Sequence, residues 1–420
     1  MASLRQNTWN LDQWYDQNVA GNVSYEGDTQ LWVMGNNPSD YPLDEAIPSS
    51  PNSWRSSPVQ LSGKWVNGTN AGGGSAATWA IRNDGSVWVW GKAAPGAGTL
   101  GLNQPGPTKV SSPKQVMAAP STGYVTRVSG NESTAMAVQD GKLWGWGANP
   151  GGIMGQNVGP APSGIDGYSS PTQIGTESTW SKNFAVSQNH ALAVKTDGTL
   201  WVWGGTSTSS NYGQLGQGNK THNYYSSPTQ IGTDTDWSTE PNSIDVNYAA
   251  GCVKSTGELF LWGRNGDQGV LGQAESGGQD ANSRSSPIQL PGTTWKSINI
   301  NYNMSAAVKT DGSLWTWGSN AWGQLGLNQQ GNHTTGQSYS SPKQIPGTTW
   351  SNMWTSGEIC WAVKTDGTLW SWGHNETTSW IGQNSQVSLS SPAQIGTDTT
   401  WSPTANNSIS AYRSMLYKNV

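Results

Sequence analysis

One five-residue phrase recurs seven times along the chain, and this repetition limits the fold more than any other feature. Each copy carries two large residues, usually Trp, separated by one residue, and each copy ends in Gly. A second phrase, Ser-Ser-Pro, also occurs seven times, in step with the first. The copies of the first phrase begin at positions 31, 87, 143, 200, 259, 314 and 369, which are 56, 56, 57, 59, 55 and 55 residues apart. The chain is therefore one structural unit repeated seven times.

Residues 180–231 show how one unit folds. Asp197-Gly198 lies between two apolar stretches, which is a tight-turn signal, and Ser227-Pro228 opens a further strand, where Pro is tolerated. Helical periodicity is absent. Four strands in each of seven units predict an all-β fold, a closed seven-bladed β-propeller in which four-stranded blades pack side by side around an axis. The other three strands are expected at residues 180–186, 191–194 and 200–203.

The chain ends predict how the ring closes. Residues 401–420 repeat only the first half of a unit and stop where the Asp-Gly turn would be. We expect these strands to pair with the first phrase, Leu31–Gly35. Residues 9–27 also resemble a degraded first half, so one terminal copy is surplus, and the irregular turn that follows favours the N-terminal copy as the surplus one. We therefore predict an N-terminal arm at residues 1–20 and a single propeller domain at residues 21–420.

Composition excludes several classes of function. Charged residues make up 11% of the 420 residues, and the net charge of −5 comes with no basic cluster, which argues against nucleic-acid binding. No apolar stretch is long enough to span a membrane, so we expect no membrane insertion, and the first 20 residues lack the apolar run of a secretory signal. The four His share neither a repeat phase nor a metal-ligand spacing. We therefore predict no cofactor, no metal and no enzymatic activity.

Tryptophan replaces the usual core residues. The chain has 26 Trp and only 2 Phe, and most of the Trp recur at fixed places in the repeat. Each Trp can bury on the order of 200 Å². We therefore predict that these side chains pack between blades and do not form a ligand platform. Cys252 and Cys360 both fall in expected second strands, where we predict small buried hydrophobic residues.

The repeated phrases also resemble a known family. The pattern Gly-x-x-x-x-Gly-Gln-Leu-Gly, then Pro-x-Gln-Ile, then Ala-Val-Lys-Thr-Asp-Gly-Thr-Leu-Trp-x-Trp-Gly is similar to the regulator of chromosome condensation repeat, over residues ~31–420. The resemblance implies a seven-bladed propeller. Members of that family include a guanine-nucleotide exchange factor, a plant photoreceptor and a bacterial β-lactamase inhibitor. The family's Gly-x-x-His survives only in part, at His190, which together with the low charge weakens the exchange-factor and photoreceptor interpretations.

The low charge and the Asn-, Ser-, Thr- and Gln-rich loops resemble bacterial and phage-encoded members of the family. They favour a non-enzymatic structural or attachment protein of a phage virion, which docks to other virion proteins or presents loops to a host. The alternative is a host-encoded protein-binding propeller, an inhibitor or scaffold in the bacterial cytoplasm or outside the cell. A third hypothesis is a glycan-binding module that uses loop aromatics such as Tyr224 and Tyr225.

Two groups of residues are candidates for binding. The first is apolar and lies in the arm, where it would dock to a partner, although an extra strand of the first blade would explain it equally well: Trp9, Leu11, Trp14 and Tyr15. The second lies in the loops of variable length before Ser-Ser-Pro: His222, Tyr224 and His333.

Overall fold

A computed structural model describes most of the repeated region. The described residues are 29–36, 54–61, 63, 65–66, 77–92, 98–104, 109–120, 125–131, 133–159, 167–205, 211–221, 224–275, 282–329, 337–375, 381–383, 385, 387–403, 408–409 and 413–419.

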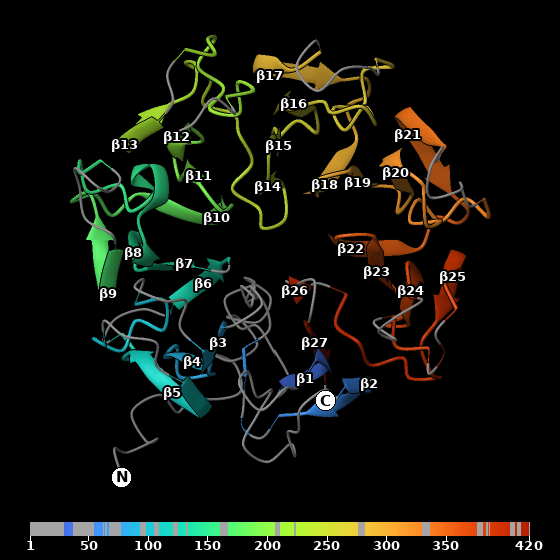
Figure 1. Ribbon diagram of the computed structural model, residues 1–420, viewed down its shortest axis with the longest axis horizontal. Coiled ribbons are helices and arrows are strands. Elements are labelled where there is room, and N and C mark those ends of the chain that lie inside the picture. Colours follow the sequence, from blue (N-terminus) through green and yellow to red (C-terminus); the bar gives the residue numbers. More distant parts are fainter. Residues whose placement is uncertain are drawn as a thin grey trace, which may run out of the picture.

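The described strands form seven antiparallel sheets arranged around a common axis, as Figure 1 shows. Six sheets have four strands. Blade 1 has three described strands, because residues 67–76, which precede its first described strand, lie outside the described part. The blades are as follows: blade 1, β3 (Ala77–Ile81), β4 (Val87–Lys92) and β5 (Lys109–Met117); blade 2, β6 (Val125–Gly130), β7 (Thr134–Gln139), β8 (Lys142–Ala148) and β9 (Gly167–Ile174); blade 3, β10 (Trp180–Val186), β11 (His190–Lys195), β12 (Leu200–Gly205) and β13 (Tyr224–Gln230); blade 4, β14 (Ile244–Val246), β15 (Ala249–Val253), β16 (Leu259–Gly263) and β17 (Arg284–Leu290); blade 5, β18 (Trp295–Ile300), β19 (Met304–Lys309), β20 (Leu314–Ser319) and β21 (Ser338–Ile345); blade 6, β22 (Trp350–Ser356), β23 (Ile359–Lys364), β24 (Leu369–Gly373) and β25 (Leu389–Gln394); closing blade, β26 (Ser408–Ile409), β27 (Arg413–Asn419), β1 (Thr29–Asn36) and β2 (Trp54–Gln60).

In blades 2 to 6 the strands follow chain order from the axis to the rim, with the first strand innermost (Figure 1). Because consecutive strands are antiparallel, the connections alternate between the two ends of the blade. The loops from first to second strand and from third to fourth strand share one side of the disc, which we call the loop face. The Asp-Gly turns and the connections between blades share the other side, which we call the turn face.

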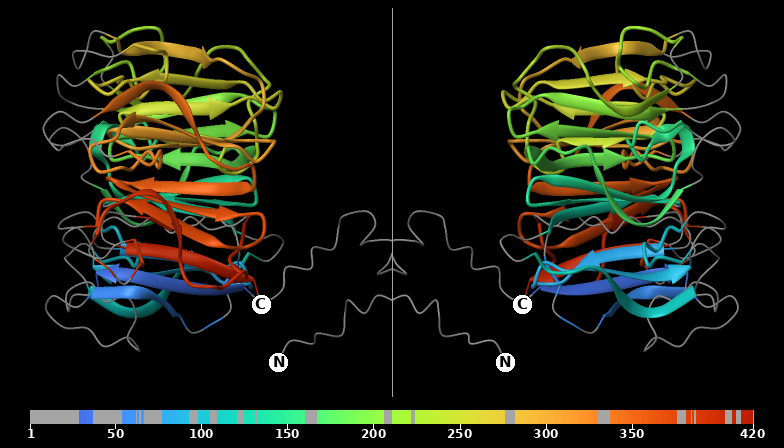
Figure 2. Two further views of the ribbon diagram at one scale, coloured as in Figure 1. Left: turned by 90° about the vertical axis from the view of Figure 1, so that its right-hand side faces the viewer. Right: turned by 90° about the vertical axis from the view of Figure 1, so that its left-hand side faces the viewer.

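The C-terminal strand completes the blade that begins the chain. β27 pairs with β1 in a continuous register from Thr29↔Asn419 to Gly35↔Arg413. The order of strands in this sheet is β2-β1-β27-β26, so one blade combines segments from both ends of the described chain. Figure 2 shows the C-terminal strand lying beside β1. The predicted pairing of the C-terminal half-repeat with the first phrase is confirmed. The arm at residues 1–20 and its boundary lie outside the described residues and stay predictions.

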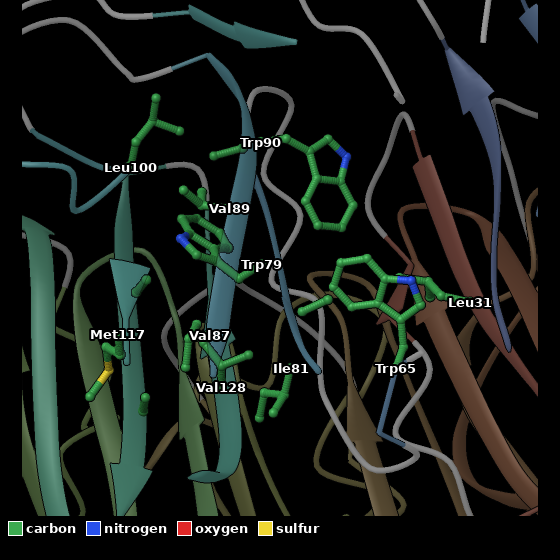
Figure 3. Close-up of a cluster of buried hydrophobic side chains, with 14 of the residues drawn as sticks. Leu31, Trp65, Trp79, Ile81, Val87, Val89, Trp90, Leu100, Met117 and Val128 are labelled. Atoms are coloured by element: carbon green, nitrogen blue, oxygen red, sulfur yellow. The ribbon is translucent and has the colours of Figure 1, made fainter. Parts of the chain in front are cut away.

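Hydrophobic clusters join each blade to the next, all the way round the ring. One cluster joins the closing blade to blades 1 and 2 and includes Trp79 and Trp90, and Figure 3 shows Leu31 beside Trp65. Another joins blade 6 to the closing blade through Leu416. The second Trp of the repeated phrase is buried in every blade from 1 to 6, as predicted: Trp90, Trp146, Trp203, Trp262, Trp317 and Trp372, each at most 1% exposed.

The first large residue of each phrase is only half-buried, and a cation covers it in every blade except blade 2. In blade 3 the Lys195 Nζ lies 3.8 Å from the ring centroid of Trp201 and 5.0 Å from that of Trp180. Such a contact stabilises by about 0.5–1 kcal/mol at an exposed site. The same arrangement recurs at the end of the second strand in other blades, with Arg82, Lys254, Lys309, Lys364 and Lys418. These cations cover the tryptophans that would otherwise be an exposed aromatic platform.

The loops of the loop face are held by hydrogen bonds from the following blade. The indole Nε1 of Trp262 donates to the Gln214 carbonyl of blade 3 at 3.0 Å, and that of Trp372 donates to the Gln324 carbonyl of blade 5 at 2.9 Å. Within its own blade, the Asn265 side chain accepts a hydrogen bond from the Leu271 backbone N–H at 2.9 Å. The side chains that these loops carry are therefore fixed in position.

No helix among the described residues is long and apolar enough to cross a membrane.

Candidate partner-binding site on the loop face

Four side chains from three successive blades meet on the loop face. Tyr212 lies in the β12–β13 loop, Tyr248 in the β14–β15 turn and Tyr302 in the β18–β19 turn. Arg264 is the first residue after β16. We call these four residues the Arg264 cluster.

The three phenol rings surround the Arg264 guanidinium. Its carbon Cζ lies 4.4 Å from the ring centroid of Tyr302, 5.6 Å from that of Tyr212 and 5.9 Å from that of Tyr248. The rings contact one another edge to face, with 5.4 Å between the centroids of Tyr248 and Tyr302 and 6.4 Å between those of Tyr212 and Tyr248. A cation over aromatic faces is favourable, so the rings hold the guanidinium in place.

Backbone contacts place the cluster. The Arg264 N–H donates to the Tyr248 carbonyl at 3.0 Å. The preceding Gly263 has a φ of +91°, and a Cβ there would lie 2.7 Å from that same carbonyl oxygen, so only Gly permits the approach. In blade 5 the Asn301 side chain donates to the Gly357 carbonyl of blade 6 at 2.7 Å and accepts from the Tyr302 N–H, which fixes the exposed ring.

Arg264 is a buried cation without an acceptor. The residue is only 6% exposed, whereas Tyr302 beside it is 45% exposed, so the cation lies just beneath the surface. Its Nε is buried without a hydrogen-bond partner, and no described residue forms a hydrogen bond or ion pair with its side chain. A buried charged donor without an acceptor is costly. The site can therefore bind an acceptor that comes from outside the described residues.

Blade 6 contains a related arrangement in which the acceptor is present. His374 follows Trp-Gly, as Arg264 does, and its ring stacks on Trp322 with centroids 3.8 Å apart. Trp322 precedes Gly-Gln-Leu-Gly at the repeat position that is Tyr in blade 3. Glu358, at the repeat position of Tyr248, places a carboxylate oxygen 3.4 Å from the His374 Nδ1.

Two further charged residues, Arg127 and Asp245 on inner strands, make structural contacts to the backbone. The Arg127 Nη1 donates to the Lys182 carbonyl at 3.3 Å. Asp245 accepts from the backbone N–H groups of Ile300 at 2.6 Å and Val246 at 2.9 Å, which ties blade 4 to blade 5. Burial raises the pKa of Asp245 to about 6 and lowers the pKa of Arg127 to about 10. These groups satisfy the inner strands and do not form an open site.

The residues predicted from sequence do not meet in this cluster. The arm residues Trp9, Leu11, Trp14 and Tyr15 lie outside the described residues, as do the loop residues His222 and His333. Tyr224 is described and is 39% exposed on β13 at the rim. Its neighbour Tyr225 is partly buried and packs against two of the hydrophobic clusters, which is a structural role.

The described residues hold no group of three or more His, Cys, Asp or Glu side chains that could bind a metal ion. The loop carboxylates of Asp234 and Asp236 pair with the Lys254 Nζ at 2.8 and 2.9 Å. Cys252 and Cys360 are fully buried, as predicted, and burial raises the pKa of both thiols. Their thiolates are therefore not available for chemistry at neutral pH.

Sequence comparison identifies the repeat. Residues 197–245 and 311–354 match the model of the Regulator of chromosome condensation (RCC1) repeat. Two stretches of the chain therefore match the RCC1 repeat. Curated relatives include the human E3 ubiquitin-protein ligase HERC2, 26% identical over 332 residues that cover 74% of this chain and 6% of the relative. The Regulator of chromosome condensation of Xenopus laevis is 27% identical over 291 residues, which cover 65% of this chain and 63% of the relative. The chain thus spans a small part of the ligase and less than two thirds of the frog protein.

Solved structures show the same fold. Human WBSCR16 has a TM-score of 0.72 at 17% identity, with 93% of this chain and 99% of that one covered. Prp20p from Saccharomyces cerevisiae has a TM-score of 0.70 at 17% identity, with 94% and 92% covered. At such low identity these likenesses establish the RCC1-type propeller fold alone.

The RCC1 repeat His identified from sequence is a core residue here. His190 is 2% exposed, and its Nδ1 lies 3.0 Å from the Ser187 Oγ. In the strand register it pairs with Gly204, as Met304 pairs with Gly318 in blade 5. The equivalent residue in blade 2 is Thr134, which pairs with Gly147. Burial lowers the pKa of His190 to about 4.

We expect His190→Met to remove an acid-sensitive contribution to the stability of this propeller. The unfolded chain binds a proton near pH 6.5, whereas the native state resists protonation until about pH 4. The free energy of unfolding of the wild type should therefore fall as the pH drops from 6.5 to 4, by roughly 3 kcal/mol from this residue. Met occupies the same position in blade 5, so the variant should fold. Denaturant unfolding at pH 7 and pH 4.5 measures the effect.

Asp245 titrates in the same window with the opposite sign, because its raised pKa destabilises the native state as the pH rises from about 4 to 6. It is present in both proteins, so its contribution cancels in the comparison. Equal pH slopes for the wild type and His190→Met would contradict the prediction.

The Arg264 cluster was not found from sequence. None of its four residues is among the candidate binding residues predicted from the sequence. The available signal was departure from the repeat. The residue after Trp-Gly is uncharged in blades 2, 3 and 5, namely Ala148, Gly205 and Ser319, so an Arg there is not needed to form a blade.

Proposed function

We propose that this chain is a non-enzymatic, protein-binding propeller, a scaffold or an inhibitor, whose partner docks on the loop face around the Arg264 cluster. The observation that carries the proposal is a half-exposed aromatic ring above a buried cation that has no acceptor among the described residues. Aromatic and Arg residues are the types enriched at the centres of protein interfaces.

The relatives support protein binding in general. Prp20p has described binding properties toward Gsp1p and histones, and yeast RCC1 has been solved with Kap60 bound. None of these three partners is transferred to this chain, whose acidic composition also lacks the basic surface that binding to DNA in chromatin would require. The ligase activity in the name of HERC2 is not proposed either, because the matched region is 6% of that protein.

The virion role stays a more specific prediction. The relatives named above are eukaryotic proteins, and they favour the protein-binding alternative over a phage structural protein. The virion location rests on composition alone. The docking role of residues 1–20 lies outside the described residues and stays a prediction. A glycan-binding role gains no support from Tyr225, which packs in the core.

Loop-face variants test the proposal. We expect Tyr302→Ala and Trp322→Ala to reduce capture of the native partner from the source organism at least tenfold, as measured by affinity purification with quantitative mass spectrometry. An interface aromatic typically contributes 2 kcal/mol or more when it is central. Lys142→Ala and Lys296→Ala are the matched controls, because both residues are exposed and lie at the turn face. Equal loss in the turn-face variants, or unchanged capture by the loop-face variants, would contradict the proposed face.

A further inference from the structure

The Arg264 cluster has the chemistry of a carboxylate-binding site. We propose that it takes the side chain of an aspartate or glutamate from the docked partner, with the carboxylate paired to the Arg264 guanidinium. The inference rests on the proposed protein-binding function and specifies what the loop face recognises.

The first argument is the unused hydrogen-bonding capacity of Arg264. A guanidinium has five N–H donors in a planar fork that matches both oxygens of a carboxylate. The side chain is 6% exposed and is surrounded by phenol rings, which are poor acceptors, and its Nε is an orphan donor. An incoming carboxylate would satisfy these donors in an environment where charge-assisted hydrogen bonds are strong.

The second argument comes from blade 6 of the same chain. There the residue after Trp-Gly, His374, also lies on an aromatic ring, and the chain itself supplies the carboxylate of Glu358 at 3.4 Å. In blade 4 the equivalent position is Tyr248, which cannot act as a counter-ion. Blade 6 therefore carries an internal version of the contact that blade 4 leaves open.

The third argument concerns which anion fits. Arg264 is the single cation of the cluster. One guanidinium balances the charge of a monoanionic carboxylate, whereas a dianionic phosphate would keep an uncompensated negative charge. The half-exposed ring of Tyr302 provides an apolar wall for the methylene groups of the incoming side chain, beside an opening to the surface.

Two blocked amino acids test the proposal directly. The probes are N-acetyl-glutamate N-methylamide and the uncharged N-acetyl-glutamine N-methylamide, titrated into full-length protein that carries ring-labelled tyrosine. We expect the glutamate probe to shift the ring resonances of Tyr212, Tyr248 and Tyr302. Its dissociation constant should lie roughly in the millimolar range, because so small a ligand makes few contacts. The glutamine probe should bind at least tenfold more weakly. A third probe, N-acetyl-glycine, carries only a main-chain carboxylate, and we expect it to bind more weakly than the glutamate probe.

Variants separate the charge from the fold. Arg264→Gln should abolish the shifts, and Arg264→Lys should restore part of the affinity for the glutamate probe. Thermal unfolding of each variant shows whether the propeller is intact, and a variant that unfolds is replaced by Tyr302→Ala, which leaves the cation in place but removes the apolar wall. Equal binding of the glutamate and glutamine probes, no shift in the wild type, or unchanged shifts in Arg264→Gln would each overturn the carboxylate assignment.

The outcome is independent of the test of the proposed function. If loop-face variants lose the partner while the glutamate probe does not bind, the protein-binding function stands and the carboxylate assignment is wrong. If the probe binds but the loop-face variants still capture the partner, the anion site is real and the docking face is wrong.

Discussion

Leu416→Asp is expected to abolish cooperative folding of the propeller. Leu416 is fully buried in the cluster that joins blade 6 to the closing blade, and its strand, β27, pairs with β1. An aspartate there would place an unpaired charge in an apolar core, which costs more than about 4 kcal/mol. Equilibrium unfolding followed by Trp fluorescence, together with gel filtration, should show a protein that is expanded or aggregated where the wild type is compact.

Asn419→Asp is the matched control for that variant. It adds the same carboxylate at the exposed end of the same strand, where Asn419 donates its backbone N–H to the Thr400 carbonyl at 2.9 Å. We expect a change of less than about 0.5 kcal/mol, as is usual for surface substitutions. A folded Leu416→Asp protein with near-wild-type stability would mean that the closing blade is dispensable for the ring.

Gly367→Ala is expected to destabilise the protein by about 3 kcal/mol or more. Gly367 sits in the Asp-Gly turn of blade 6 with a φ of +77°, and a Cβ at this position would lie 2.0 Å from the Thr399 carbonyl oxygen. The substitution therefore combines the strain of a positive φ with a collision against rigid backbone of the next connection. Denaturant unfolding at neutral pH measures the loss.

Gly396→Ala separates the two effects. Gly396 has a φ of +61° and nothing within 4 Å of the built Cβ. The conformational penalty alone is about 1–2 kcal/mol. If both variants lose the same stability, the contact between the turn and the next connection is not what selects Gly in the Asp-Gly phrase.

The repeat made the fold predictable because each unit solves the same packing problem. The Asp-Gly pairs predicted the turns correctly, and the turn Asp accepts hydrogen bonds that hold the turn together. Asp366 accepts hydrogen bonds from the N–H and the hydroxyl of Thr368 at 3.0 and 2.7 Å, and that hydroxyl accepts from the Trp370 indole at 2.8 Å. The side-chain bond from Thr368 is the main cause of the lowered pKa of Asp366. The truncated final repeat also indicated which segment it pairs with. Half a blade leaves a strand edge without hydrogen-bond partners, and the Leu31–Gly35 phrase supplies the missing strand.

The cation over each aromatic pair was visible in the sequence but was not interpreted. Lys195 and Lys364 stand at the end of the second strand, two residues before the Asp of the Asp-Gly turn. Only the register, which sets Lys195 opposite Trp180 and Lys364 opposite Trp350, shows that these side chains lie over the rings. Their aliphatic stems cover the indoles while the charge stays near water.

The candidate site was not predictable by the same route. A repeat analysis finds what the units share, whereas Tyr212, Tyr248, Arg264 and Tyr302 are departures from the repeat in three different blades. Their residue numbers span about 90 positions, and they meet only because successive blades stack around the axis. Function in such a fold resides in what individual units change, on loops held by a shared framework.

The sheet shared by β1 and β27 also affects how this protein is made. A ribosome synthesises residues 29–36 nearly four hundred residues before it delivers residues 413–419, and β1 has no inner neighbour until then. Throughout translation the nascent chain therefore presents an unpaired strand edge, the kind of edge on which polypeptides aggregate. Such long-range pairing is intrinsically slow, so the closing blade forms late, only once residues 413–419 are available to cover β1.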